Sequence, residues 1–257
     1  MAGLVLVLAA APALAGCAGK ASRTTASGSP SASPSPLSPK DTLAASFKQL
    51  GQTSYSATVK DGDTTGEATV DSGHQSARVS ITMATSGVSI KLGTTAVGSD
   101  VWVTMDMGPQ LNSQFGLDPK KWMHVDKTRL KGDQAKQFDF TPSDPLDVDG
   151  LLDAVVDVKR TDSQHYSGTL DMTKATGSSK PADDVLTKAG DKAKSVPFTA
   201  TLDDQGRLLS FKVDGAAVDP SLAHEVTISG YGTQSVTAPN PADVIEMPAK
   251  VYDLLNG

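Results

Sequence analysis

The single cysteine, Cys17, is the side chain whose type and setting indicate the most specific chemistry in this 257-residue chain. A lone cysteine cannot form an internal disulfide. It follows an uncharged apolar run, residues 4–15, which is shorter than the roughly 20 apolar residues of a membrane-spanning helix. Such a run is typical of a secretory signal. Because Leu14-Ala15-Gly16-Cys17 has the form of a bacterial lipobox, we expect residues 1–16 to be a lipoprotein signal peptide and the Cys17 thiol to carry lipid.

Acylation of Cys17 would attach the exported chain to a membrane. Each methylene buried in the bilayer contributes about 0.8 kcal/mol of binding free energy. A diacylglyceryl group with a further palmitate-like chain therefore anchors a protein stably in the membrane, whereas a single acyl chain does not. Residues 17–39 are rich in Ser, Pro, Thr, Gly and Ala and cannot bury enough apolar surface to order themselves. We therefore expect a disordered tether that starts at the lipidated cysteine on the outer face of the cell membrane. The alternative is a buried structural cysteine after an apolar stretch.

Other residues that could perform chemistry form no recognisable catalytic or metal-binding pattern. The sequence has no Gly-x-Ser-x-Gly elbow and no phosphate-binding Gly-x-x-x-x-Gly-Lys loop. The histidines are far apart, and we expect them at the surface: His74, His124, His165 and His224. An acidic group could attract calcium, but its spacing is not that of an EF-hand, and ordinary helix capping is the interpretation that we favour: Asp139, Asp144, Asp147, Asp149 and Asp153. We expect no enzyme activity, no metal and no cofactor.

Composition restricts the partners of the chain. The formal net charge is -6 and the pI is about 5.1. Nucleic-acid binding requires a basic face, so we expect no nucleic-acid partner. Charge also disfavours docking on anionic lipid, which leaves the acyl group as the membrane attachment. Residues 40–257 have the length of one domain, which we expect to be a monomer.

Hydrophobic periodicity predicts a helix followed by a meander of strands. Leu43, Phe47 and Leu50 lie at helical spacing in residues 40–50, and Gly51 follows as a stop signal. After Gly51 the period changes to two, and short turn sequences separate the alternating segments. These segments are predicted strands: residues 53–60, 65–71, 76–83, 87–92, 100–106 and 121–126. Successive strands with short turns indicate an antiparallel sheet with one apolar face.

The second half of the chain is predicted to mix helices with further strands. An apolar stripe in the second half of residues 134–160 predicts a helix there: Leu151, Leu152, Val155 and Val156. Residues 181–189 predict a short helix. Strands are predicted at residues 165–172, in a hairpin over 196–214 that turns at Asp203–Gly206, and at residues 224–232. The fold class is therefore α+β, with one long antiparallel sheet and a few helices that cover one face.

A sheet with this many strands must curl rather than stay flat. Small residues recur on its inward-facing positions, which is consistent with unfilled space: Ala57, Ala68, Ala77, Gly168 and Ala200. The same pattern is consistent with tight packing, because alanine is abundant in the chain. Trp102 and Trp122 lie on the opposite face from their apolar neighbours. They could be ligand platforms or partner contacts, or they could cover the rim of the sheet.

The order of these features resembles a known family. A lipobox, a Ser/Pro tether, an N-terminal helix, a meander and a late hairpin are followed by a closing run with Tyr231, Gly232, Val236 and Pro239. The chain resembles the actinobacterial lipoproteins of the LppX/LprG type, which share the half-barrel fold of the LolA and LolB carriers. The resemblance implies a half-open sheet around helices, with an apolar cavity that binds acylated lipids or lipoglycans, over most of residues 40–248.

Two functional hypotheses follow. The first is a membrane-anchored, non-enzymatic binder or carrier of an amphiphilic lipid or lipoglycan in the cell envelope, whose cavity lies between the sheet and the helices. The residues expected to line that cavity are Val79, Ile81, Ile90, Val101, Val103, Met105, Leu151, Leu152 and Val155. The second is an envelope-anchored interaction or sensing module with a solid core, in which Trp102 or Trp122 contacts a partner. A cavity of several hundred Å³ favours the first.

Overall fold

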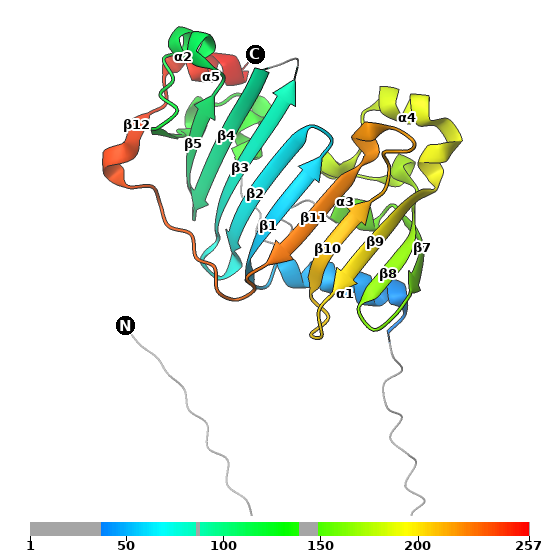
Figure 1. Cartoon of the computed structure of the whole chain (residues 1–257). Helices are drawn as coiled ribbons and strands as arrows, with labels where there is room; N and C mark the ends of the chain where they lie inside the picture. The colour runs from blue at the N-terminus through cyan, green and yellow to red at the C-terminus, as the bar shows by residue number, and fades with distance from the viewer. Residues whose placement is uncertain (1–36, 86–87, 139–148, 257) are drawn as a thin grey trace, which may run out of the picture. The chain divides into compact units, whose positions relative to one another are not determined.

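The computed structural model of the chain describes residues 37–85, 88–138 and 149–256 (Figure 1). These residues belong to one compact unit, Leu37–Gly257. Cys17, the predicted signal peptide and most of the predicted tether lie outside the described residues, as do Asp139, Asp144 and Asp147. The hydrogen bonds and core contacts described below all join residues of this unit.

Five α-helices and a sheet of twelve strands make up the described part of this unit. The helices are α1 (Pro39–Leu50), α2 (Pro109–Phe115), α3 (Asp149–Leu152), α4 (Asp183–Ala189) and α5 (Ala249–Asn256). The strands are β1 (Ser54–Asp61), β2 (Thr64–Asp71), β3 (Ser76–Thr85), β4 (Val88–Val97), β5 (Asp100–Asp106), β6 (Trp122–His124), β7 (Val155–Arg160), β8 (His165–Leu170), β9 (Val196–Leu202), β10 (Leu208–Val213), β11 (His224–Ser229) and β12 (Val244–Glu246). The 3-10 helices that bear on the site are η4 (Met172–Lys174), η5 (Gly177–Ser179) and η7 (Pro220–Leu222).

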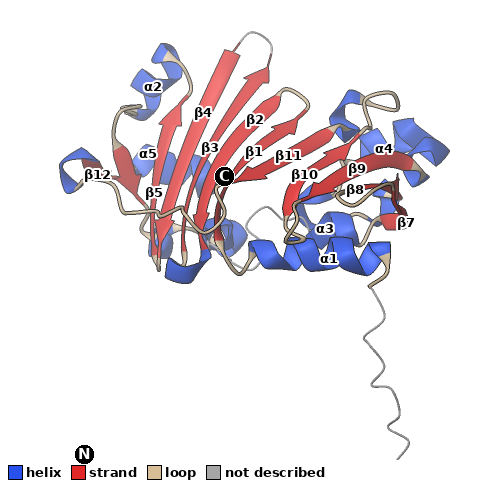
Figure 2. Cartoon of the chain, turned by 60° about the horizontal axis from the view of Figure 1, so that its bottom comes forward, coloured by secondary structure: helices blue, strands red, loops and turns tan. Residues whose placement is uncertain are grey.

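The twelve strands form one open sheet. Their order is β12-β6-β5-β4-β3-β2-β1-β11-β10-β9-β8-β7, and only the β12–β6 pair is parallel. Pairing of β1 with β11 joins the N-terminal meander to the C-terminal strands, with Ala57 opposite Ile228. The sheet does not close, because β12 and β7 end it at its two edges. Its curvature is plain in Figure 2. The predicted α+β class with a long, curved, mostly antiparallel sheet is confirmed.

The first hydrophobic core lies between α1 and the strands β1, β2 and β8–β11. Ser38 begins α1 as its N-cap, since its hydroxyl accepts a hydrogen bond from the Asp41 N–H at 3.1 Å. The Phe47 ring meets Phe211 of β10 edge to face at a centroid distance of 5.4 Å. Phe211 also stacks on Phe198 of β9 at 5.0 Å. The helix at residues 40–50 is thus confirmed, and it buries its apolar stripe against the sheet.

A second core lies under β5 and β6 at the other end of the sheet. There, Val251 and Tyr252 of α5 pack with Val101, Val103 and Met123. Both cores lie on the same face, because Ala77 of the first core pairs directly with Ala96 of the second. Helices α1 and α3 cover this concave face (Figure 2).

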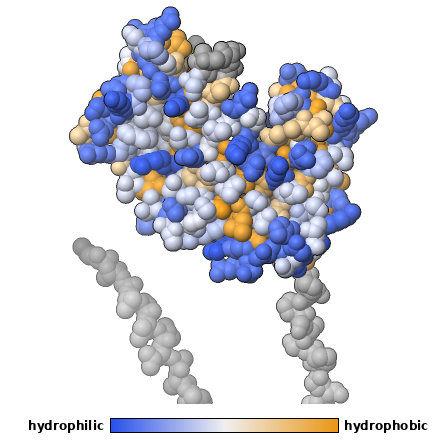
Figure 3. Space-filling view, viewed as in Figure 1, coloured by the Kyte–Doolittle hydropathy of each residue, from blue (hydrophilic) through white to orange (hydrophobic). Residues whose placement is uncertain are grey.

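The convex face of the sheet is mainly polar. Its positions alternate with those of the cores, and they include Thr58, Glu67, Ser80 and Thr227, all exposed. Figure 3 shows this face with hydrophilic residues over most of it and apolar residues in separate small patches. One face of the antiparallel sheet is therefore wet and the other is packed, as the alternation predicts.

The predicted helix in the second half of residues 134–160 is wrong for most of its length. Helix α3 has a single turn that ends at Leu152, and Val155 begins the strand β7. The run Val155–Val158 is rich in β-branched residues, which favour a strand, and pairing with β8 outweighs the helical spacing. Helices α2 and α5 and strand β12 are further elements that were not predicted from the sequence.

The closing run of the chain stabilises the sheet. Tyr231 donates a hydrogen bond from its hydroxyl to the Leu208 carbonyl at 2.5 Å, and the Arg207 guanidinium lies over its ring at 4.6 Å. Burial raises the pKa of the Tyr231 hydroxyl well above its usual range. Gly232 has a positive φ of 75° and donates from its N–H to the Ser54 carbonyl at 2.8 Å. These contacts tie the end of β11 to β10 and β1.

Candidate functional site

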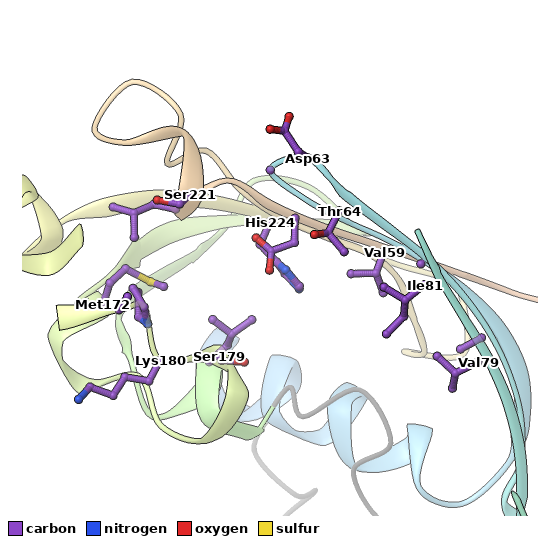
Figure 4. Close-up of a pocket in the computed structure, with 18 of the residues that line it drawn as sticks. Val59, Asp63, Thr64, Val79, Ile81, Met172, Ser179, Lys180, Ser221 and His224 are labelled. Atoms are coloured by element: carbon purple, nitrogen blue, oxygen red, sulfur yellow. The ribbon is translucent and has the colours of Figure 1, made fainter. Parts of the chain in front are cut away.

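A cavity of about 610 Å³ lies on the concave side of the sheet, between β1–β3 and β11 and the segments that face them (Figure 4). We call it the sheet cavity. The strands line it with Val59, Gly66, Ala68, Val79, Ile81 and His224. The opposite wall consists of Leu151 of α3, Met172 of η4, the segment 179–182 that leads into α4, and Ser221 and Leu222 of η7. The cavity is thus lined by segments that are far apart in sequence.

The lining combines buried apolar residues with exposed polar ones. The buried apolar residues are Ala68, Leu151, Met172 and Leu222. The exposed residues, which we call the rim, include Asp61 and Asp63 of the β1–β2 hairpin, together with Lys180 and Ser221. A mainly apolar lining with a few polar groups is typical of a small-molecule site.

Two small residues of β2 help to keep this space open. Gly66 lies between Val59 of β1 and Ile81 of β3 in the register of the sheet, so all three face the cavity. A Cβ added at Gly66 would meet its nearest neighbours, the Ser80 carbonyl oxygen and the Val59 Cβ, at 3.7 Å, an ordinary van der Waals distance. Two positions along β2, Ala68 faces the same side. The space above these residues is therefore available to a ligand or to a larger side chain.

Aspartates fix the wall opposite the sheet. Asp219 caps η7 by accepting a hydrogen bond from the Ser221 N–H at 3.1 Å, and the Lys188 ammonium of α4 lies 2.7 Å from its other oxygen. The hydrogen bond from Lys188, followed by those from Ser221, lowers the pKa of Asp219 to about 2. Asp171 caps η4 in the same way through the Thr173 N–H. These capped turns hold Leu222 and Met172 against the cavity.

The rim carries more negative than positive charge. No ion pair joins the carboxylate of Asp61 or Asp63 to a cation among residues 37–85, 88–138 and 149–256. Lys180 is paired, since its ammonium lies 3.0 Å from Asp183. Figure 4 shows the Lys180 side chain extending away from the cavity. The rim is therefore acidic around the β1–β2 hairpin.

His224 is the titratable residue inside the sheet cavity. It pairs with Asp61 in the register of β1 and β11, and Figure 4 shows its ring between Val59 and Met172. Burial lowers the pKa of His224 from 6.5, and the nearby Asp61 opposes this effect. The predicted surface position of this histidine is wrong, because pairing with β1 turns the side chain toward the concave face.

Acidification should destabilise the unit through His224. Its pKa is lower in the folded chain than the unfolded value of 6.5, so below pH 6.5 the unfolded chain binds more protons. Stability is therefore lost as the pH falls from about 6.5 through the folded pKa. We expect His224→Gln to reduce the fall in melting temperature between about pH 7.5 and about pH 5.5. An equal fall in both proteins, measured by differential scanning calorimetry, would contradict this account.

The other histidines lie outside the cavity lining and accompany aspartates. His74 lies 2.8 Å from Asp71, and His165 lies 2.9 Å from Asp162. His124 is more loosely placed, 3.3 Å from Asp100. In the described parts of the chain, no serine or cysteine side chain is hydrogen-bonded to these rings, so the pairs do not form a nucleophile-activating arrangement.

The two tryptophans lie on the convex face. Trp122 extends over Gly93, since a Cβ added there would lie 3.6 Å from the Trp122 Cη2, and Arg78 lies 5.7 Å from its ring centroid. Trp102 lies beside His124, with ring centroids 5.6 Å apart. Trp122 therefore packs on the sheet at Gly93.

The sheet cavity includes some of the residues predicted to line a site. Val79, Ile81 and Leu151 line it. The other predicted residues lie elsewhere: Val101, Val103 and Met105 in or against the second core, Val155 and Leu152 in or against the first, and Ile90 half-buried on β4. Val155 belongs to a strand and not to the predicted helix. The structure therefore brings together only the part of this set that lies near β2.

Several lining residues were missed by the sequence analysis. Met172, Leu222 and His224 line the cavity because η4, η7 and the start of β11 lie along it, an arrangement that no local pattern indicates. Gly66 does have a signal, since a glycine inside an alternating strand often marks a close approach or a missing side chain. Of the small inward residues, only Ala68 lines the cavity, whereas Ala57, Ala77 and Ala200 are buried in the first core.

Residues 37–85, 88–138 and 149–256 contain no group of three or more His, Cys, Asp or Glu side chains placed to hold a metal ion. Asp149 begins α3, and Asp153 accepts a hydrogen bond from Thr176 at 3.4 Å. In the same ranges, every helix is too short or too polar to cross a lipid bilayer.

Comparison with known proteins adds little. No protein-family model matches the chain, and no curated protein matches it. Among solved structures, the DNA polymerase sliding clamp of Pseudomonas aeruginosa aligns with 79% of this chain at 10% sequence identity and a TM-score of 0.14. The alignment covers 62% of the clamp chain. A TM-score this low carries no argument about fold or function.

Proposed function

We propose that this protein is an envelope lipoprotein, anchored on the outer face of the cell membrane through an acylated Cys17, which binds or carries an amphiphilic lipid without catalysing a reaction. The observation that carries the proposal is the sheet cavity of about 610 Å³, which is lined by buried apolar residues and has exposed polar residues at its rim. Removal of apolar surface from water contributes about 25 cal/mol per Å², so a chain buried against Leu151, Met172 and Leu222 would bind mainly by this effect.

The cavity also supports this proposal over a solid-core interaction module. A module that works through Trp102 or Trp122 on the convex face has no need of a cavity on the concave face. Cavities in this size range and with this polarity are typical of ligand sites. The resemblance to LppX/LprG-type lipoproteins described above points in the same direction, since it implies lipid or lipoglycan binding between a curved sheet and its helices.

Native mass spectrometry of the protein purified from its own host tests the proposal. We expect a fraction of the molecules to carry a mass adduct that organic solvent extracts as a lipid. A lipid-free spectrum, together with no uptake from mixed-lipid vesicles offered afterwards, would contradict lipid binding. The Cys17→Ser variant, which we expect in the soluble fraction, is used for this measurement so that no detergent is needed, because detergent chains would compete for the same apolar space.

The anchor is tested separately with Cys17→Ser. We expect this variant to incorporate no labelled palmitate in the host and to shift from the membrane fraction to the soluble fraction, since the thiol that receives the diacylglyceryl group is missing. Ser22→Ala, five residues further along the predicted tether, is the matched control and should label normally. Labelling of the Cys17→Ser protein would contradict the lipobox assignment.

A further inference from the structure

His224 differs from the other histidines that the structure describes, because its ring lines the sheet cavity and is not held by an aspartate. In the register of the sheet it lies between Asp61 of β1 and Val213 of β10. Within the described residues, no side chain forms a hydrogen bond or an ion pair with this half-buried ring. Figure 4 shows it between Val59 and Met172, which also line the cavity. In the empty protein, solvent therefore hydrates the ring.

A hydrocarbon chain in the sheet cavity would displace that solvent. Val59 and Met172 flank the ring, so a chain that contacts both of them also covers His224. A charged imidazolium that loses its hydration without gaining a paired carboxylate is costly, whereas the neutral ring is tolerated much better. A bound chain therefore favours the neutral form of His224, and by reciprocity the neutral form favours the bound chain.

The other charged groups around the cavity leave this coupling to His224. The nearest one in the register is Asp61, which favours the charged ring and so opposes the effect of burial. Asp63 and Glu67 also line the cavity, and β10 places the uncharged Val213 beside the ring. The charged residues of the opposite wall lie in pairs: Lys180 with Asp183, Lys188 with Asp219, and Lys174 with Asp171. Ordinary carboxylates and lysines do not change charge between about pH 5.5 and about pH 8, whereas a histidine does.

We infer that the sheet cavity holds its lipid with His224 neutral, so that mild acidification weakens binding and favours release. This inference rests on the proposed lipid-binding function and adds a condition for release. Burial already lowers the pKa of His224 from 6.5 in the empty protein, and a chain that covers the ring would lower it further. Below its pKa in the empty protein, the empty form binds a proton that the loaded form does not. The Kd therefore rises as the pH falls, by at most about tenfold per pH unit for one group.

Titration of the full-length Cys17→Ser protein with a fluorescent lysophosphatidylcholine tests the inference. The zwitterionic head group of this probe keeps its charge over the range used, so a change in Kd belongs to the protein. We expect the Kd to rise several-fold between about pH 7.5 and about pH 5.5, in protein that circular dichroism shows to be folded at both. A Kd that stays equal or falls would overturn the inference and leave the proposed function standing. Absence of binding at both pH values would count against the proposed function as well.

The variant His224→Gln assigns the effect to one ring. It has no titratable group at this position, so its Kd should change by less than about twofold between the two pH values, whatever its affinity at the higher one. His165→Gln is the matched control, because His165 lies 2.9 Å from Asp162 and outside the cavity lining, and it should keep the full pH dependence. A pH dependence in His224→Gln as large as that of the parent would overturn the inference.

Nuclear magnetic resonance of the histidine rings gives a readout that does not depend on affinity. The His224 signals are assigned by their loss in His224→Gln, and their titration gives the pKa in the empty and in the lipid-saturated protein. We expect the lower pKa in the saturated protein, with the rings of His74 and His165 unchanged. An equal or higher pKa of His224 in the saturated protein would contradict the coupling directly.

Discussion

Replacing Gly66 with phenylalanine should abolish most ligand binding without unfolding the protein. The added ring would project from β2 into the sheet cavity between Val59 and Ile81, where a Cβ meets only ordinary van der Waals contacts at 3.7 Å. If it displaces about four methylenes of the ligand, at about 0.8 kcal/mol each, the loss is roughly 3 kcal/mol, or on the order of 100-fold in Kd. Titration with a fluorescent single-chain lipid measures this directly.

A phenylalanine at the neighbouring position 65 serves as the control. It distinguishes loss of lipid binding through filling of the cavity from loss through damage to β2. Thr65→Phe places an identical side chain on the opposite, exposed face of β2, and it should bind the lipid as the unmodified unit does. The Gly66→Phe variant should also keep or raise its melting temperature, because glycine is unfavourable inside a strand. Unchanged lipid affinity in a folded Gly66→Phe variant would show that the ligand does not use this cavity.

Much of the fold could be predicted because its signals are local. Tyr55, Ala57 and Val59 alternate with polar residues, and burial of that alternation against α1 determines the face of each strand. The failure at Val155 has a physical reason. A spacing of three to four residues between apolar positions fits a helix, but Val155 and Val158 are β-branched and pair with Leu170 and Gly168 of β8, with one irregularity in register between Val155 and Asp157.

The site was less predictable because it is made by long-range pairing. The β1–β11 pair brings His224 beside Asp61, and the ion pair between Lys188 and Asp219 holds η7 against α4. Neither contact leaves a pattern in the sequence near those residues. The prediction of the lining depended on apolar alternation alone. Alternation identifies the side chains that face the concave side of the sheet, but not those that a helix covers. Val101 and Val103 show this, since α5 packs directly over them.

The cavity and the first core share a wall, so the stability of the core bears on the site. Val59 and Val79 line the cavity and also pack against the first core. Close-packed neighbours transmit changes in volume, so a void made in the core would move these residues. Removing a central core side chain should therefore lower the free energy of unfolding strongly. It should also weaken lipid binding, but by a smaller free energy.

We expect Phe211→Ala to be the most destabilising single truncation considered for this chain. Phe211 is 0% exposed, stacks on Phe198 at 5.0 Å and meets Phe47 edge to face at 5.4 Å. Truncation of such a ring leaves a cavity and costs about 3–5 kcal/mol, a large part of the 5–15 kcal/mol typical of a domain. The free energy of unfolding from urea titration should fall by this amount, and the melting temperature by about 10 °C.

Phe115→Ala provides the matched comparison in the second core. The chemical change is identical, but Phe115 at the end of α2 is only partly buried against that core. Its truncation removes less apolar contact and leaves a space that solvent can enter, so we expect less than half the loss found for Phe211→Ala. Because one continuous sheet joins both cores, each variant should still unfold in a single transition. Equal losses in the two variants would mean that the aromatic cluster around Phe211 does not dominate the stability of the unit.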